Sequence, residues 1–261
     1  MRFRPCIDIH NGKVKQIVGG SLKDQGDRAA ENFVSEMDGA YYADFYKKDG
    51  LKGGHIILLN PASSPYYEAT KQQALLALGA YPGGFQLGGG ITPDNAKAFL
   101  DAGASHVIVT SYVFRDGKIS TDNLRRMLDC VGKEHLVLDL SCRKKDGAYY
   151  VVTDRWQKFT ETKVTADTLE WLRDSCAEFL IHAVDVEGKA SGIEVPLVEL
   201  LADMDNFPCT YAGGVGSFED LARLKQAGRG KVDVTIGSAL DLFGGKMPYR
   251  EVLEYIKKAA D

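Results

Sequence analysis

Aspartates at the ends of two apolar runs are the residues best placed for proton-transfer chemistry. Asp8 ends a run that begins at Cys6, Asp139 ends a run that begins at Val137, and the two aspartates lie 131 residues apart (139 − 8). A single aspartate at a strand end is more often a helix cap or a loop carboxylate, but two in corresponding positions favour a chemical role. Because carboxyl groups can accept or donate protons, the sequence predicts general acid–base catalysis. Asp139 has a structural alternative, as a support for the hairpin predicted after it.

Two glycine-rich turns repeat one order of residue types: the end of a strand, adjacent glycines and the first turn of a helix. Glycine exposes its backbone N–H groups, and a helix start attracts anions, so each turn is typical of a phosphate site. The turns lie 124 residues apart (214 − 90), and the serines that end the following strands lie 127 apart (238 − 111). One such turn is as often a plain connection, but a second copy favours paired anion sites. The predicted anion-binding residues are Gly89, Gly90 and Ser111 in the first half and Gly213, Gly214, Gly237 and Ser238 in the second.

Strands and helices alternate along the whole chain, which predicts parallel strands with right-handed crossovers. Eight such units in 261 residues favour one closed (β/α)8 TIM barrel over an open doubly wound sheet, and the repeat divides it into half-barrels at approximately 1–131 and 132–261. We expect hairpins at 13–18 and 142–160 and a loop at 19–27. Strands are expected at 3–9, 55–59, 85–87, 106–110, 135–140, 179–182, 209–211 and 232–238, and helices at 40–48, 67–78, 121–129, 166–174, 195–204 and 248–258, with one after each glycine turn. In such barrels the chemistry lies at the carboxyl ends of the strands, where all these candidate residues fall.

Composition and charge exclude several classes of function. A net charge of −4 argues against nucleic-acid binding, which favours a basic surface. The five cysteines form no CxxC pair, and the five histidines show no metal-ligand spacing, so we expect reduced thiols and no metal. No apolar run reaches the ~18 residues of a membrane span, and no targeting segment is visible. We therefore expect a cytoplasmic, monomeric enzyme that acts on a small molecule.

Several of these motifs together resemble one enzyme family over nearly the whole chain. They are the opening Arg4-Pro5-Cys6-Ile7-Asp8-Ile9 with Asn11-Gly12-Lys13, the two glycine turns, and Asp185-Val186-Glu187-Gly188-Lys189-Ala190-Ser191-Gly192. The chain resembles the phosphoribosylformimino-5-aminoimidazole carboxamide ribotide (ProFAR) isomerases of histidine biosynthesis, in their eukaryotic form. The resemblance implies a duplicated half-barrel, no metal and no organic cofactor. It also implies an Amadori rearrangement, in which the aminoaldose ProFAR, a bisphosphate, becomes the aminoketose PRFAR.

The resemblance assigns roles to individual residues of this chain. Asp8 matches the general base that takes the proton from the sugar C2′, and Asp139 matches the carboxylate of the fifth strand. Glu187 stands where the family has an aspartate that is a possible general acid, and His182 stands where the family has threonine. His182 is predicted either to orient or replace the acid or to be a core histidine. The predicted substrate-binding residues of the adjoining loops are Arg155, Trp156, which could stack on the carboxamide-imidazole or simply pack, Gly188 and Gly192.

Two departures from the family weaken a phosphate contact and remove a candidate carboxylate. Thr92 replaces a frequent arginine after the first glycine turn, which removes a charge near phosphate, and Asn60 replaces a frequent aspartate after the second strand. Two other functions stay open. The sister cyclase shares the repeat and both aspartates but needs a glutaminase partner, and a non-catalytic phosphometabolite-binding barrel would keep only the anion turns. Turnover of the aminoaldose bisphosphate without an ammonia source distinguishes the isomerase from both.

Overall fold

Eight parallel strands close into a barrel in the computed structural model, which describes residues 1–19, 21–23 and 28–258. The barrel closes where Phe3 lies beside Val234: Arg4 N–H donates to Val234 O at 2.8 Å, and Val234 N–H donates to Arg2 O at 2.9 Å. The predicted (β/α)8 barrel is therefore confirmed, although the first strand itself begins at Cys6. The barrel strands are β1 (Cys6–His10), β4 (Gly54–Leu58), β5 (Phe85–Gly88), β6 (His106–Val109), β9 (Leu136–Asp139), β13 (Glu178–His182), β14 (Cys209–Ala212) and β15 (Asp233–Thr235).

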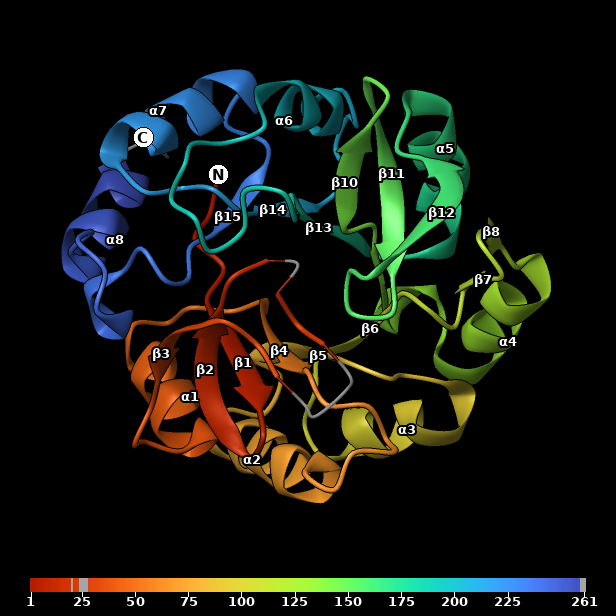
Figure 1. Ribbon diagram of the computed structural model, residues 1–261, viewed down its shortest axis with the longest axis horizontal. Coiled ribbons are helices and arrows are strands. Elements are labelled where there is room, and N and C mark those ends of the chain that lie inside the picture. Colours follow the sequence, from red (N-terminus) through yellow and green to blue (C-terminus); the bar gives the residue numbers. More distant parts are fainter. Residues whose placement is uncertain (20, 24–27, 259–261) are drawn as a thin grey trace.

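Helices surround the barrel and follow one another around it in chain order (Figure 1). They bury their apolar faces against the outer side of the strands, where the main hydrophobic core lies. Asp38, Ser120, Thr165 and Ser217 cap four of them by accepting a backbone N–H of the first turn. The helices are α1 (Gly39–Lys48), α2 (Tyr67–Ala80), α3 (Pro93–Asp101), α4 (Thr121–Val131), α5 (Ala166–Leu172), α6 (Val195–Ala202), α7 (Phe218–Ala227) and α8 (Tyr249–Lys258), with 3-10 turns at Lys133–His135, Arg173–Ser175 and Asp241–Phe243.

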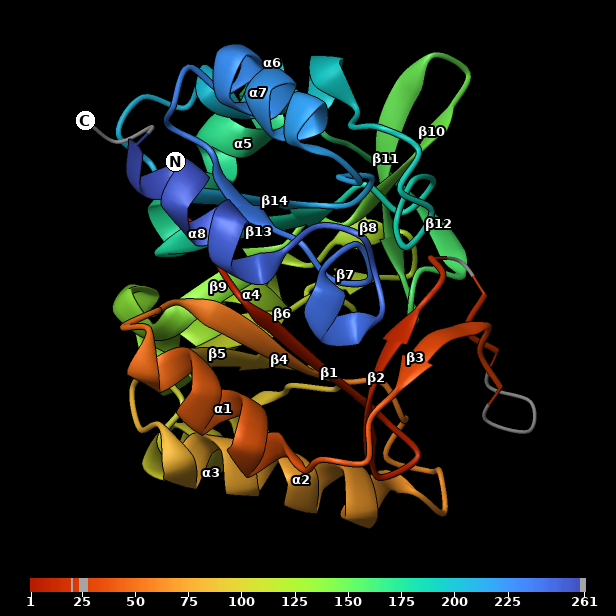
Figure 2. The ribbon, with the colours of Figure 1, turned by 90° about the vertical axis from the view of Figure 1, so that its left-hand side faces the viewer.

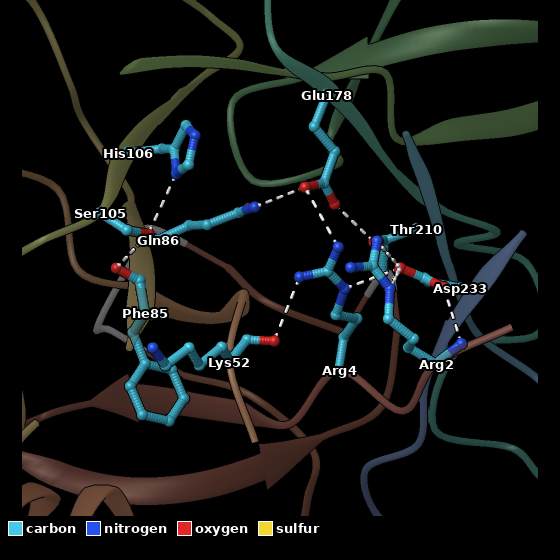
Figure 3. Close-up of polar contacts among 10 residues, drawn as sticks. All are labelled: Arg2, Arg4, Lys52, Phe85, Gln86, Ser105, His106, Glu178, Thr210 and Asp233. Atoms are coloured by element: carbon cyan, nitrogen blue, oxygen red, sulfur yellow. Dashed lines mark hydrogen bonds and ion pairs between the residues drawn. The ribbon is translucent and has the colours of Figure 1, made fainter. Parts of the chain in front are cut away.

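The amino-terminal end of the barrel interior is filled by buried polar side chains (Figure 3). The Glu178 carboxylate accepts hydrogen bonds from Gln86 Nε2 at 2.8 Å and Thr210 Oγ1 at 2.5 Å. The Arg4 guanidinium lies 2.8 Å from Asp233 and 3.7 Å from Glu178. These groups satisfy one another, so the layer supports the barrel from below. A separate apolar cluster of the barrel residues Ile108, Val137 and Leu180 is also buried.

Additional strands extend beyond the barrel on the side away from the amino terminus (Figure 2). The predicted first hairpin arm is β2 (Lys13–Ile17), and a third strand that the sequence did not indicate, β3 (Glu31–Val34), pairs with it. The predicted hairpin at 142–160 is instead a three-stranded sheet of β10 (Cys142–Lys145), β11 (Ala148–Thr153) and β12 (Lys158–Lys163). A small unpredicted hairpin consists of β7 (Phe114–Arg115) and β8 (Lys118–Ile119). Of the predicted loop at 19–27, residues 20 and 24–27 lie outside the described residues.

Candidate active site

Two cavities lie at the carboxyl ends of the strands, and each contains the glycine turn of one half-barrel. The first-half cavity has a volume of 290 Å³ and is lined by Gly89, Gly90 and Ser111 among others. The second-half cavity is narrow, at 20 Å³, which is close to the room needed by one water molecule. Its predicted lining residues are Gly213, Gly214, Gly237 and Ser238. His182 lines both cavities, so it stands at their junction.

The second-half cavity brings Asp8 and Glu187 together, although they are 179 residues apart in the chain (187 − 8). Burial raises the pKa of Asp8 to about 7. Burial and the nearby negative charge of Asp8 raise the pKa of Glu187 to about 8. Near neutral pH this pair can therefore hold one proton-accepting carboxylate and one proton-donating carboxyl group.

Asp139 lines the other cavity, and its carboxylate is occupied by hydrogen bonds. One oxygen accepts from Thr110 Oγ1 at 3.1 Å, and the other accepts from the backbone N–H of Ser141 at 2.7 Å and from the Ser141 hydroxyl. Ser141 Oγ also lies 3.0 Å from His182 Nδ1. Because the serine hydroxyl has a single proton and donates it to Asp139, it can only accept from the imidazole. This arrangement fixes the Nδ1–H tautomer of neutral His182 and leaves Nε2 as a proton acceptor.

His182 lies close to two aromatic rings at the junction of the cavities. Its ring centroid lies 5.3 Å from that of Trp156 and 5.3 Å from that of His55. Burial lowers the pKa of His182, while the Asp139 carboxylate opposes this shift. The structure thus places His182 beside the predicted site, in a setting that favours the neutral imidazole.

Arg155 and Trp156, which the sequence analysis proposed as substrate-binding residues, line the first-half cavity from the connection between β11 and β12. Three consecutive residues, Asp154, Arg155 and Trp156, have φ of 52°, 55° and 67°. This uncommon left-handed backbone turns the segment toward the barrel mouth. The Asp154 N–H donates to Ser111 Oγ at 3.0 Å, so the segment is tied to the end of the fourth barrel strand.

The loop that carries Glu187 is held at several points. Gly192 N–H donates to Gly214 O at 3.0 Å, which joins this loop to the second glycine turn. Asp185 binds Arg143 at 2.8 Å and accepts the Lys144 N–H at 2.8 Å, which joins it to β10. On its other side, Gly19 N–H donates to Glu187 O at 3.0 Å. Of the two predicted loop glycines, Gly188 lines the second-half cavity, whereas Gly192 does not line it and instead forms the hydrogen bond to Gly214.

Both helix starts after the glycine turns already contain internal hydrogen bonds. Asn95 Oδ1 accepts from Thr92 N–H at 3.0 Å at the start of α3. At the start of α7, Asp220 accepts from Gly216 N–H at 3.0 Å, and Ser217 Oγ accepts from Asp220 N–H at 3.2 Å. The glycines themselves, with φ between 70° and 118°, are consequently better placed than the helix ends to hold an anion.

Several residues of the site were not identified in the sequence. Ser141 and Thr110 bind Asp139, Cys6 lies in the same cavity as Asp8, and Thr235 lines that cavity from β15. Strand alternation was the available signal, since Cys6 is two residues before Asp8 and Thr235 two before Gly237. Among the residues that the structure describes, no group of three potential ligands could hold a metal ion. Within the same residues, no helix is long and apolar enough to span a membrane.

Comparison with known proteins gives a consistent result over the whole chain. The family model described as histidine biosynthesis protein matches residues 2–248. A chloroplastic (phosphoribosylamino)methylideneamino imidazole-4-carboxamide isomerase of Medicago truncatula is 53% identical over 259 residues, covering 98% of this chain and 81% of that protein. Isomerases of the same name from Neurospora crassa and Saccharomyces cerevisiae are 45% and 42% identical, with coverage of 98% and 94% of this chain and 99% and 94% of theirs. The family model covers most of the chain and these relatives are at least 42% identical to it, so the chain belongs to the histidine biosynthesis protein family.

Proposed function

We propose that this protein is an isomerase of histidine biosynthesis that converts the aminoaldose ProFAR into the aminoketose PRFAR. The observation that carries the proposal is the pairing of Asp8 with Glu187 in one cavity, beside the second glycine turn. The printed names of the relatives describe an isomerase of an imidazole carboxamide with two phosphoribosyl groups. A substrate of that kind has two phosphates, which matches two glycine turns at one barrel mouth.

Asp8 is the proposed base and Glu187 the proposed acid. Of the two, Asp8 has the lower pKa, about 7, and so loses its proton first, while Glu187, at about 8, keeps its own. Glu187 gives a proton to the ring oxygen of the sugar as the bond from C1′ to that oxygen breaks and an imine forms. Asp8 then removes the proton from C2′, and the electron pair moves toward the imine nitrogen. A proton returned to C1′ and the loss of the enol proton complete the aminoketose.

Asp139 and His182 have a supporting role in this proposal. The Asp139–Ser141–His182 chain holds the imidazole through Nδ1, which leaves Nε2 free to accept a hydrogen bond from the substrate in this proposal. The sugar that isomerises occupies the second-half cavity, with its phosphate at Gly213, Gly214, Gly237 and Ser238. The other phosphoribosyl group occupies the first-half cavity, with the flat imidazole against Trp156.

The second-half cavity is narrow, at 20 Å³, so we propose that it widens when a phosphosugar binds. The Glu187 loop is the element proposed to move, and its return would exclude water from the reaction. Remote binding of both phosphates would supply the free energy for this closure.

Turnover of the purified aminoaldose bisphosphate without an ammonia source tests the proposal. An isomerase forms the aminoketose under these conditions, whereas the sister cyclase or a non-catalytic binding barrel leaves the substrate unchanged. If an Asp8→Asn, Glu187→Gln double variant forms the aminoketose at the wild-type rate, the proposed catalytic residues are wrong, although the proposed activity still holds.

Three further expectations from the sequence belong to this proposal. The half-barrels 1–131 and 132–261 are proposed as the repeated units, a monomer as the active form and the cytoplasm as the compartment. The plant relative carries the word chloroplastic in its name, so microscopy of a fluorescent fusion is needed to test the compartment. Sedimentation of the purified protein tests the monomer.

A further inference from the structure

Two buried polar atoms of the second-half cavity have no hydrogen-bond partner among the described residues. They are Oγ1 of Thr235 and Oε2 of Glu187. Thr235 is only 5% exposed, and both residues line the cavity that contains Asp8. A buried hydroxyl without a partner is unfavourable, so such atoms are rare and each needs an explanation, such as a ligand that supplies the missing hydrogen bond. Glu187 already has a proposed chemical role, but Thr235 has none.

A neighbouring threonine has the opposite environment. Thr210 on β14 is 2% exposed, and its hydroxyl donates to Glu178 at 2.5 Å in the polar layer below. The Thr210 hydroxyl thus has a fixed hydrogen-bond partner, as expected of a buried hydroxyl with a structural role. Thr235, on the adjacent strand β15, differs in facing a cavity instead of a fixed partner.

The position of Thr235 places it within reach of the proposed reacting sugar. Thr235 ends β15, and Gly237, two residues on, belongs to the same cavity and the proposed phosphate site. A Cβ at Gly237 would lie 3.6 Å from Cys6 Sγ, so this end of the last strand lies against β1, the strand that carries Asp8. The same wall of the cavity thus contains the proposed phosphate contact, the Thr235 hydroxyl and the proposed base.

We propose that Thr235 is a substrate-positioning residue whose hydroxyl binds the 3′-hydroxyl of the phosphosugar that isomerises. The assignment rests on the proposed function. With the sugar phosphate at Gly237 and Ser238 and C2′ at Asp8, the 3′ carbon is adjacent to the reacting carbon on the side toward the phosphate. A threonine hydroxyl can donate one hydrogen bond and accept two, so it suits a sugar hydroxyl. This contact orients C2′ for loss of its proton.

The test uses three variants of the full chain, Thr235→Val, Thr235→Ser and Thr210→Val, each assayed for kcat, KM and Tm. Thr235→Val keeps the shape and removes the hydroxyl, so we expect kcat/KM to fall roughly 5- to 10-fold, the worth of one hydrogen bond, without a lower Tm. Thr235→Ser should restore kcat/KM. Thr210→Val should show the reverse pattern, a lower Tm with kcat/KM close to that of the wild type.

A 3′-deoxy substrate identifies the partner of the hydroxyl. The wild type should use it less well than the natural substrate by the same factor, and Thr235→Val should no longer discriminate between the two. Unchanged kcat/KM in Thr235→Val, or a loss that Thr235→Ser fails to restore, would overturn the proposal. Discrimination retained by Thr235→Val would equally overturn the assignment to the 3′-hydroxyl. If the wild type does not convert the natural substrate at all, it is the proposed function that fails.

Discussion

Asp8 is the residue on which the proposed proton transfer depends most directly. We expect Asp8→Asn to fold normally and to lower kcat by roughly 10²–10⁴-fold, since an amide cannot take the C2′ proton. Steady-state kinetics and a thermal melt measure both effects. The matched control is Asp122→Asn on the exposed start of α4, which should leave kcat unchanged. Near-normal turnover by a folded Asp8→Asn variant would show that the base lies elsewhere.

The raised pKa values of Asp8 and Glu187 predict the pH dependence of kcat/KM. Activity should fall below a pH of about 7, where Asp8 becomes protonated, and above a pH of about 8, where Glu187 loses its proton. Both folded-state pKa values lie above the ordinary ones, so the folded protein binds more protons than the unfolded chain. The contribution of these two groups to stability should consequently decline as the pH rises from about 4 through 8.

Three substitutions separate the candidate acids in that profile. Glu187→Gln should be as damaging as Asp8→Asn and should abolish the alkaline limb. His182→Ala should be milder, or should shift the acid limb, because the imidazole supports the substrate in this scheme. If Glu187→Gln keeps full activity while Asp139→Asn abolishes it, the acid belongs to the fifth barrel strand and the present assignment is wrong.

Among the elements, the second glycine turn is packed at Gly214 against the loop that carries Glu187. A Cβ at Gly214 would lie 2.0 Å from Gly192 O, whereas a Cβ at Gly90 in the first turn meets nothing within 4 Å. Both have positive φ, so alanine costs about 1–2 kcal/mol at either position. Gly214→Ala must also displace the loop that carries Glu187.

We therefore expect Gly214→Ala to lower both the free energy of unfolding and kcat/KM by more than its matched control, Gly90→Ala. Urea unfolding and steady-state kinetics provide the measurements. Equal effects of the two substitutions would mean that the contact between Gly192 and the turn does not hold the Glu187 loop in place.

At the scale of the whole molecule, the polar layer at the amino-terminal end should govern stability and not chemistry. Arg4→Met leaves the buried Glu178 carboxylate without its cation and leaves Asp233 with the exposed Arg2 alone, and it should destabilise the fold by about 3–5 kcal/mol. The control is Arg229→Met, whose ion pair with Asp203 is exposed and should be worth about 0–1 kcal/mol. Urea unfolding measures both, and a loss of kcat in folded Arg4→Met would contradict the division between the two ends of the barrel.

The two cavities predict two anion sites in one molecule. Crystals soaked in phosphate or sulfate should contain one ordered anion at Gly89, Gly90 and Ser111 and one at Gly213, Gly214, Gly237 and Ser238. A substrate analogue with one phosphate should lose kcat as well as affinity, because remote binding energy orients the reacting carbon. If a monophosphate is converted as fast as the bisphosphate, the second glycine turn is not needed as a phosphate site and the repeat reflects only the ancestry of the fold.

Local patterns in the sequence were sufficient for the architecture and for placing the candidate residues at the carboxyl ends of the strands. Alternating apolar runs and helix starts predicted the barrel, because each strand–helix unit is specified by neighbouring residues. The two glycine turns could be recognised in the sequence because glycine is favoured where the backbone takes positive φ, and each turn lines one of the two cavities. The sequence did not indicate β3 or the third strand of the β10–β12 sheet. Those strands are short and exposed at an edge, so their pairing depends on the surface that they meet.

Which acids share a cavity was decided only by the tertiary structure. Asp8 and Asp139 have equivalent positions in the repeat, yet closure of the barrel places Asp8 with Glu187, and Ser141 joins Asp139 to His182. The pKa shifts of Asp8 and Glu187 and the unpartnered hydroxyl of Thr235 also arise from burial among residues distant in the chain. Spacing along a strand determines the end at which a side chain emerges. Spacing does not determine which side chains lie across the barrel from one another, or how completely folding buries them. The proposed proton transfer depends on both.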